Sequence, residues 1–573
     1  MNINQNVKLG LIAAVVLILL FVLSMLLTGD PSMRTGVLTL LPPIVAIGLA
    51  FITKDTILSL FAGVFIGEFM LVVTDMNLLA SLVNAFFGLV NEVIGVATDP
   101  WNMAIILQCF FIGGVIALVA KMGGAKALAE ALSKRANSPK KAQLITWVLG
   151  LLVFFDDYAN SLIVGPIMTP VMDKLKVSRE KLAFIVDSTA APVAGIAIIS
   201  TWIGLELSLI NDGLDVIGLK GVTAFSLFVQ SIPFRFYNIL ILAFIVISAL
   251  TLREFGPMKK AEQQARKRKA GEKPPEANLN LQLGNMEPAE KAKLTIWNAI
   301  IPIGTLIIVA LIAFYWTGYT AIIGGEDEVL RNLMLTSPIS FNGIFEAMAA
   351  ADASIALLQS AIIASVVAIL MAVGQRIYTV GEAITNWIQG LKTIVITFVI
   401  LLLAWSLGAV IGSVGTADYL ISILSGTIPY WILPALIFVF GAVISFATGT
   451  AYGTMGILMP LAIPLAWAVK TGDVNYLVVC ISGVLTGAIF GDHCSPISDT
   501  TIMSSMGSGC DHIAHVNTQI YYAVFVGLIA ILIGYLPAGF GVPSWVSLIA
   551  GVIVVFLGLR FIGEEVPFEE EAV

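Results

Sequence analysis

The stretch "FFDDYANSLIVGPIMTP", Phe154–Pro170, places two adjacent aspartates in a run that is otherwise almost entirely apolar. Basic residues flank it on both sides: Lys134, Arg135, Lys140 and Lys141 before it, and Lys174, Lys176, Arg179 and Lys181 after it. In a membrane protein such clusters collect on the cytoplasmic side. A single crossing would put one of the clusters outside. The pattern therefore predicts a re-entrant hairpin over 142–172, which enters and leaves on the cytoplasmic side and turns at "DDYANS".

The composition is that of a membrane protein. Of 573 residues, 58% are hydrophobic and 12% are charged, whereas soluble domains are about 25% charged. Apolar runs long enough to cross a bilayer recur from end to end. The predicted spans are 9–28, 37–53, 56–74, 102–120, 182–208, 226–250, 296–316, 352–372, 393–413, 476–505, 519–538 and 546–562. The predicted fold class is an all-α polytopic membrane protein with about 11–12 transmembrane helices.

Other classes of protein find little support in the sequence. The formal net charge of −7 arises in large part from the acidic tail "GEEVPFEEEAV", which we expect to be solvated. No two of the four cysteines have CxxC spacing, so neither a disulfide framework nor a redox motif is indicated. The sequence has no Walker-type GxxxxGK[ST] and no HExxH. We therefore expect no enzyme activity, no cofactor and no nucleic-acid partner.

A second copy of the hairpin follows in the other half. "MGGAKALAEALS", Met122–Ser133, matches "VGTADYLISILS", Val414–Ser425, at an offset of 292 that sets "FFDDYANS" over "FATGTAYG". Further on, "VDSTAAPVAG" lies over "FGDHCSPISD". The flanks of the second hairpin carry one lysine between them, so they are predicted to be extracellular. Inverted repeats with broken helices are typical of secondary transporters.

These observations divide the chain into five parts. They are an N-terminal transmembrane helix (1–36), a first inverted repeat (37–250), a cytoplasmic linker (251–294), a second inverted repeat (295–540) and a C-terminal helix with an acidic tail (541–573). The first repeat holds the hairpin 142–172 and a broken helix, 182–208. The second holds a hairpin at 432–468 and a broken helix, 476–505, with its break at Cys494–Ser498.

Polar residues gather at these four interruptions, which should meet near the middle of the membrane. A carboxylate there is costly and is a functional hypothesis by default. The residues expected to couple ions or protons are Asp157, Asp187, Asp499, Asp492 and Asp156. Those expected to contact a cation or substrate are Asn160, Ser161, Ser188, Thr189, Thr450, Tyr452, Thr454, His493, Ser495, Ser498 and Thr500. Carboxylates, hydroxyls and free carbonyls are hard ligands that suit Na⁺ at the hairpin tips and helix breaks.

Each of these residues also has a purely structural interpretation. Asp156 points to a different face from Asp157 and is as well explained by capping the turn. Asp499 could cap the helix that follows it, and His493 could be a neutral hydrogen-bonded group. In "GCDHIAHVNT", the spacing of Asp511, His512 and His515 could hold a transition metal, but an interfacial loop is the favoured interpretation.

The motifs resemble those of the NhaC-type sodium/proton antiporters. "GDHCSPISDTTIMSSMGSGCDHIAHVNTQIYYA" is similar to that family's most characteristic stretch, and "FFDDYANSLIVGP", "DSTAAPVA" and "GTAYGTMGILMPLAIPLA" resemble its other polar breaks. The resemblance implies membership of the ion-transporter superfamily, with a scaffold domain, often dimeric, and a moving transport domain. It leaves the substrate open, because the family also includes exchangers of organic acids.

The leading hypothesis is a Na⁺/H⁺ antiporter of the cytoplasmic membrane that works by alternating access of the elevator type. A buried carboxylate that binds either Na⁺ or H⁺ couples the two flows, because each ion expels the other. The expected partners are Na⁺, H⁺, the lipid bilayer and a second copy of the chain. The alternative is a Na⁺- or H⁺-coupled carrier of a small organic solute, an organic acid or amino acid, which would contact His493 and Asn160.

Overall fold

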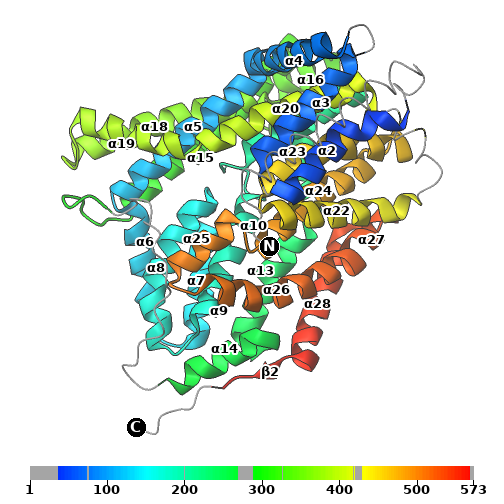
Figure 1. The fold of residues 1–573 in the computed structure, drawn as a ribbon. Coiled ribbons are helices and arrows are strands. Elements are labelled where there is room, and N and C mark those ends of the chain that lie inside the picture. Colours follow the sequence, from blue (N-terminus) through cyan, green and yellow to red (C-terminus); the bar gives the residue numbers. More distant parts are fainter. Residues whose placement is uncertain are drawn as a thin grey trace.

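The computed structural model describes residues 36–567 except 54, 74–76, 199, 269–287, 326, 417, 418, 420, 421 and 423–428. The predicted first span, 9–28, lies outside these residues, as does most of Val414–Ser425. The described chain is almost wholly helical, apart from one two-stranded pairing (Figure 1). Nine of its helices are long and apolar enough to cross a membrane, and one bent pair adds a tenth. This confirms the all-α polytopic class.

Long apolar helices form one side of the molecule. They are α5 (Pro100–Lys121), α15 (Trp297–Gly324), α18 (Ala353–Gly374) and α20 (Val395–Val414), together with the shorter α2 (Leu41–Thr53), η2 (Val37–Leu40), α3 (Thr56–Val72), α16 (Glu328–Thr336), α17 (Phe341–Ala349) and α19 (Val380–Thr393). Helices α5 and α19 cross closely, because a Cβ on Gly390 would lie 2.3 Å from the carbonyl oxygen of Gly113. Only glycine allows that approach.

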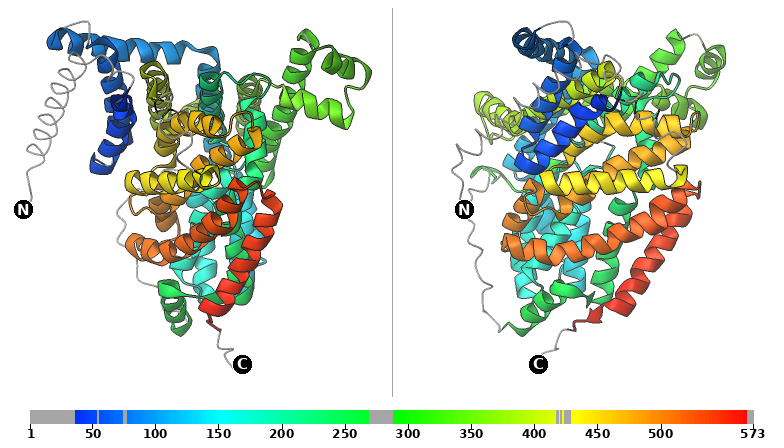
Figure 2. Two further views of the ribbon diagram at one scale, coloured as in Figure 1. Left: turned by 90° about the vertical axis from the view of Figure 1, so that its right-hand side faces the viewer. Right: turned by 45° about the vertical axis from the view of Figure 1, so that its right-hand side comes forward.

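Helix α4 (Leu78–Thr98) was not predicted. It runs across the ends of α2 and α3 at the top of the molecule (Figure 2). Its hydropathy and its 21 residues qualify it as a membrane span. Asn84, Asn91 and Glu92 interrupt its apolar residues, which weakens the sequence signal of a span between 74 and 102.

Two helical hairpins stand where the repeats predicted them. The first joins α7 (Pro139–Leu152) to α8 (Asp157–Lys174), and the second joins α22 (Leu433–Thr448), after η4 (Tyr430–Ile432), to α23 (Ala451–Val469). The second turns at Gly449, whose φ of 69° is in the left-handed region that glycine tolerates. The first turns at 153–156, just before the predicted position. "DYANS" forms the start of α8 instead, because Asp157 in the first turn complements the helix dipole.

The hairpins align at an offset of 294, not 292. Helix α8 carries Pro166 and Pro170, and α23 carries Pro460 and Pro464, at the tenth and fourteenth position of each helix. Matches between apolar residues arise easily by chance. The shared helix starts and the shared proline pairs are stronger evidence for the offset of 294. The correction places Tyr158 opposite Tyr452.

Both broken helices are present. In the second repeat α24 (Val474–Cys494) ends and α25 (Asp499–Gly507) begins, so the predicted break at Cys494–Ser498 is confirmed. In the first repeat α9 (Arg179–Ser188) is followed by the single turn α10 (Ala191–Ala194) and, after an irregular segment, by α11 (Ile203–Ile217). The chain therefore breaks on both sides of α10, and Pro192 starts that short helix, where its missing N–H costs nothing.

The remaining helices pack around the two breaks. They are α6 (Gly124–Ser133), α12 (Ala224–Ser231), η3 (Ile232–Phe234), α13 (Phe236–Thr251), α14 (Gly256–Lys267), α26 (His512–Ile529), η5 (Ala530–Tyr535), α27 (Leu536–Gly539) and α28 (Ser544–Ile562). Of these, α28 runs down one edge of the molecule (Figure 2). The predicted span at 226–250 is the bent pair α12–η3 and α13, with an angle of 42°.

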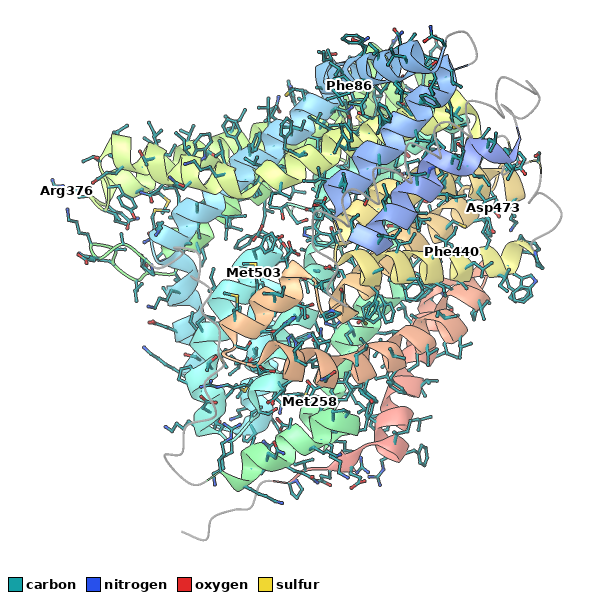
Figure 3. All side chains as sticks on the ribbon, viewed as in Figure 1. Phe86, Met258, Arg376, Phe440, Asp473 and Met503 are labelled. Carbon is teal, nitrogen blue, oxygen red and sulfur yellow. The ribbon has the colours of Figure 1, made fainter. Side chains whose placement is uncertain are left out.

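The first part of the predicted linker, 251–294, is ordered. Residues 256–267 form helix α14, which buries Met258 beneath α26 (Figure 3), and Glu262 accepts a hydrogen bond of 2.8 Å from the backbone N–H of Ser178. Before it, β1 (Arg253–Glu254) pairs antiparallel with β2 (Glu564–Glu565), which ties down the start of the acidic tail. Charged residues on one face hid the amphipathic pattern of α14 from composition alone.

Two buried ion pairs join these elements. Arg235 Nη2 lies 2.9 Å from Glu206 Oε2, and both side chains are fully buried. Lys181 Nζ lies 2.9 Å from Glu254 Oε1 beneath the aromatic ring of Tyr522. Glu206 is therefore shielded from water and paired with a buried cation.

The hairpin topology predicts the sides from which cysteines react. Ser178 is buried, so the exposed residues Lys140 and Lys174 are better labelling sites. We expect Lys140→Cys and Lys174→Cys to react with an impermeant maleimide from the cytoplasmic side, and Thr471→Cys from the opposite side. The four native cysteines are buried and give a low background. Labelling of Lys140→Cys and Lys174→Cys from opposite sides would show that the segment crosses the membrane once.

The pair of Arg235 with Glu206 predicts a loss of stability. Glu206→Gln leaves the buried guanidinium without a counter-charge, and we expect it to lower the free energy of unfolding by about 3–5 kcal/mol, measured by thermal unfolding in detergent. The matched control is the half-exposed pair of Lys470 with Asp473, at 2.8 Å. Lys470→Gln should cost less than about 1 kcal/mol. Equal effects of the two substitutions would contradict this ranking.

Candidate functional site

A cavity of about 380 Å³ lies where the two hairpins and the second break meet α5, α19 and α20. Met503 on α25, labelled in Figure 3, lies on its wall. The polar residues that line it are Asp156, Asp157, Tyr158, Thr201, Thr450, Tyr452, Asp492, Asp499 and Thr500. Four of the five predicted coupling carboxylates thus share one cavity, together with three of the predicted hydroxyl ligands.

The charge of this cavity is strongly one-sided. Four carboxyl groups line it, and none of its lining residues is a lysine, arginine or histidine. Asp156, Asp157 and Asp492 are 6%, 4% and 2% exposed, whereas Asp499 is open to the cavity mouth. Like charges in a poorly solvated site repel strongly. Protons or bound cations must therefore neutralise most of this charge.

Asp492 has an unfilled acceptor. Its Oδ2 accepts a hydrogen bond of 3.1 Å from the hydroxyl of Thr500. Its Oδ1 is buried and has no hydrogen-bond partner among the described residues. A buried carboxylate oxygen without a donor costs free energy, and a cation or a proton in the cavity would remove that cost.

The two hairpin tips are tied to the site by three side chains, of which Tyr452 was predicted and Tyr158 and Thr201 were missed by the sequence analysis. The Tyr158 hydroxyl donates to Oδ2 of Asp499, which joins the first hairpin to the second break. The Thr201 hydroxyl donates to Oδ2 of Asp156 at 3.3 Å, and the Tyr452 hydroxyl donates to the Thr201 carbonyl at 3.1 Å. Thr201 thus connects both tips. The only signal for it was its place in "STWIG", shortly after the first break.

Asp187 lies behind the cavity and does not line it. Its carboxylate accepts hydrogen bonds from Gln519 Nε2 at 2.6 Å and from the Ser504 hydroxyl at 3.3 Å. Ser504 in turn lies 2.9 Å from the hydroxyl of Ser161. This predicted coupling residue thus belongs to a network that holds α9, α25, α26 and α8 together.

His493 is a buried junction between elements. Its Nδ1 lies 2.5 Å from the hydroxyl of Tyr237, and its Nε2 lies 3.0 Å from the hydroxyl of Ser188. When Tyr237 donates to Nδ1, the neutral ring carries its proton on Nε2 and donates to Ser188. Both nitrogens are then satisfied without a charge, as in the structural interpretation of this residue.

The other predicted ligands are used to hold the breaks in shape. Asn160 donates to the Thr189 carbonyl at 2.8 Å, and Ser495 donates to the Phe446 carbonyl at 2.8 Å. The rest bond locally: Ser161 to the Asp157 carbonyl, Thr189 to the Ile185 carbonyl, Thr454 to the Thr450 carbonyl, and Ser498 with Thr500. The contacts of Asn160 and Ser495 thus fill backbone carbonyls at the first break and at the end of helix α22.

The histidine-rich motif performs a similar task. Asp511 caps α26 through the N–H of Ala514 at 2.9 Å, and His512 Nε2 lies 2.7 Å from the Pro496 carbonyl in the second break. His515 lies 2.8 Å from both the Ser505 hydroxyl and Gln519 Oε1. The described part of the chain contains no group of three metal-ligating side chains.

Helix α13 secures the first break. Arg235 Nη1 donates to the Gly195 carbonyl at 3.0 Å, and Asn238 donates to the Pro192 carbonyl at 2.9 Å. Isolated polar residues in an apolar helix carry no sequence signal for such partners. Arg235 and Asn238 nevertheless donate hydrogen bonds to backbone carbonyls that the short helix α10 leaves without a partner.

Several known proteins are similar in sequence to this chain. A model of the Na⁺/H⁺ antiporter family matches residues 193–540. A protein of Haemophilus influenzae described as uncharacterized is 33% identical over 533 residues, which cover 92% of this chain and 96% of that one. A malate-2H(+)/Na(+)-lactate antiporter of Bacillus subtilis is 27% identical over 141 residues, 21% of this chain and 29% of the relative.

The fold has a solved counterpart. The structure of the Alcanivorax borkumensis YdaH transporter aligns with a TM-score of 0.52 and 15% identity, over 81% of this chain and 90% of that one. At this identity the match concerns the fold alone. The family match, which spans both the second hairpin and the second break, agrees with the resemblance of the motifs. The chain belongs to the Na⁺/H⁺ antiporter family.

Proposed function

We propose that this protein is a Na⁺/H⁺ antiporter of the cytoplasmic membrane that works by alternating access. The observation that carries the proposal is the cavity with four carboxyl groups and no basic residue in its lining. Na⁺ prefers hard oxygen ligands of this kind. The same carboxyl groups can take up protons when Na⁺ leaves, so no further chemistry is needed for exchange.

Asp157 is the best placed coupling carboxylate. It is buried, lines the cavity and begins helix α8. Asp492, with its unfilled Oδ1, faces the same space from the second repeat. Asp499 at the mouth is held by Tyr158 and supplies a first contact for a cation that arrives from water. Thr450 and Thr500 add neutral oxygens.

An elevator movement is supported by the way in which the interruptions are interlocked. Hydrogen bonds join α8 to α25, α9 to α24, and α22 to the break after α24. Elements tied in this way would move as one body. Helices α5, α19 and α20 on the other side of the cavity would then form the fixed scaffold. Dimerisation through that scaffold stays a prediction from the family resemblance.

The alternative substrate, an organic acid, fits the cavity poorly. The Bacillus subtilis relative is described as a malate-2H(+)/Na(+)-lactate antiporter. A carboxylate substrate requires a positive partner, and the cavity lining provides only carboxyl groups, hydroxyls and apolar surface. Arg235 is near the first break but is committed to Glu206 and the Gly195 carbonyl.

The test is transport by the purified protein in proteoliposomes. An imposed Na⁺ gradient should drive proton movement in the opposite direction, followed with a pH-sensitive dye inside the vesicles. The expected result is a pH change that depends on Na⁺ and on the protein. Absence of any Na⁺-driven proton movement would contradict the proposal.

The first functional prediction concerns Asp157. Asp157→Asn keeps the shape and hydrogen bonding but removes the charge that balances Na⁺ in a site of low dielectric. We expect Na⁺-driven proton movement to fall by at least about 100-fold, a loss of about 3 kcal/mol of ion binding, while thermal unfolding stays within about 1 kcal/mol of wild type.

Asp156→Asn is the matched control for this prediction. Asp156 already receives a hydrogen bond from Thr201. Loss of the Asp156 charge should therefore reduce Na⁺/H⁺ exchange only several-fold. If Asp157→Asn exchanges Na⁺ at a rate near that of wild type, the coupling role passes to Asp492 or Asp499.

The second functional prediction concerns organic acids. Because the cavity has no basic lining residue, L-malate and lactate should neither stimulate nor inhibit Na⁺/H⁺ exchange in the same vesicles. The measurement is the rate of pH change at fixed Na⁺ with each acid added outside. A stimulation that also requires Na⁺ would favour the organic-acid carrier instead.

A further inference from the structure

The cavity is larger than its charged end requires. A single Na⁺ needs only its shell of oxygen ligands, whereas a volume of about 380 Å³ lies in the range of about 300–1,000 Å³ of pockets that hold small organic molecules. The four carboxyl groups make up only part of its lining. The remainder has a different chemistry.

The remaining wall is apolar and comes from the scaffold side. Ile116 on α5, Ile394 between α19 and α20, and Ile396 and Ile400 on α20 line it. Trp202 completes it from the segment before α11 and packs edge-on against Tyr452, with ring centroids 4.9 Å apart. An acidic end and an apolar wall in one cavity match a ligand that has a positive head and a hydrocarbon body.

We infer that the cavity also binds a monovalent organic cation, a primary ammonium group on a short apolar chain, in competition with Na⁺. The inference rests on the proposed function of the acidic end as the cation site. An ammonium group brings three N–H donors and no acceptor. It can therefore fill Oδ1 of Asp492, which is buried and has no partner among the described residues, while its chain lies on the isoleucine wall.

The same features exclude other ligands. An organic anion would face four carboxyl groups. A zwitterion such as an amino acid would bring a carboxylate into a lining that has no basic side chain.

The experiment measures binding directly, without transport. Purified protein in detergent micelles is titrated with n-butylammonium near neutral pH, where the amine is protonated, by isothermal calorimetry. We expect saturable binding that Na⁺ weakens competitively. Methylammonium should bind at least tenfold more weakly, because it lacks three methylene groups that the apolar wall would bury. Pentanoate, an anion with a similar chain, should not bind.

Substitutions in the cavity wall test where the hydrocarbon chain of the ligand lies. Ile396 is 65% exposed, so Ile396→Asn does not disturb the core. It should reduce the affinity ratio between butylammonium and methylammonium by about threefold or more. Val395→Asn, at the neighbouring exposed residue outside the cavity lining, should leave that ratio unchanged. Asp492→Asn should weaken binding of both amines.

Each outcome decides the inference. Absence of butylammonium binding, equal affinity for the two amines, binding that Na⁺ does not affect, or binding of pentanoate would overturn it. The proposed function is tested separately, by Na⁺/H⁺ exchange in proteoliposomes. Exchange without butylammonium binding leaves only the further inference wrong. Competitive binding without exchange leaves only the transport proposal wrong.

Discussion

The central constraint on this structure is the repulsion between carboxyl groups that line one cavity without a basic residue beside them. Asp156, Asp157 and Asp492 are almost fully buried, and Asp499 stands beside them. Two buried ion pairs among the described residues show the contrast, since Lys181 and Arg235 each have a carboxylate partner away from the cavity. Positive charge is thus used to secure the core and is absent from the site, where mobile cations and protons take its place.

That constraint explains the use of the polar residues around the breaks. Irregular backbone inside a membrane must be satisfied by protein groups or by water. Asn160, Ser495, Arg235 and Asn238 each donate to a backbone carbonyl near an interruption. These four donors hold the breaks without drawing on Oδ1 of Asp492, which keeps no partner among the described residues and is left for an ion.

The sequence predicted the elements better than the orientation of side chains. The second break followed from Pro496 and its polar neighbours, and the first hairpin from its basic flanks. In contrast, the assignment of Asp187 to the cavity depended on which face of α9 meets the site, and only packing against α25 and α26 decides that. The roles of Thr201 and Gln519 were equally hidden, because a lone polar residue in an apolar segment does not reveal its partner.

The two repeats contribute the four carboxyl groups of the cavity from different kinds of element. Asp156 and Asp157 come from the first hairpin, but Asp492 and Asp499 come from the broken helix of the other repeat. At the corrected register Tyr158 corresponds to Tyr452, and Asp156 to Thr450, so the second hairpin is the neutral version of the first. In the proposed cycle, moving this core through lipid with its carboxylates bare would incur a large desolvation cost. Binding of Na⁺ or protons removes that charge, so the loaded core can move and the empty core cannot, which is the condition for obligatory exchange.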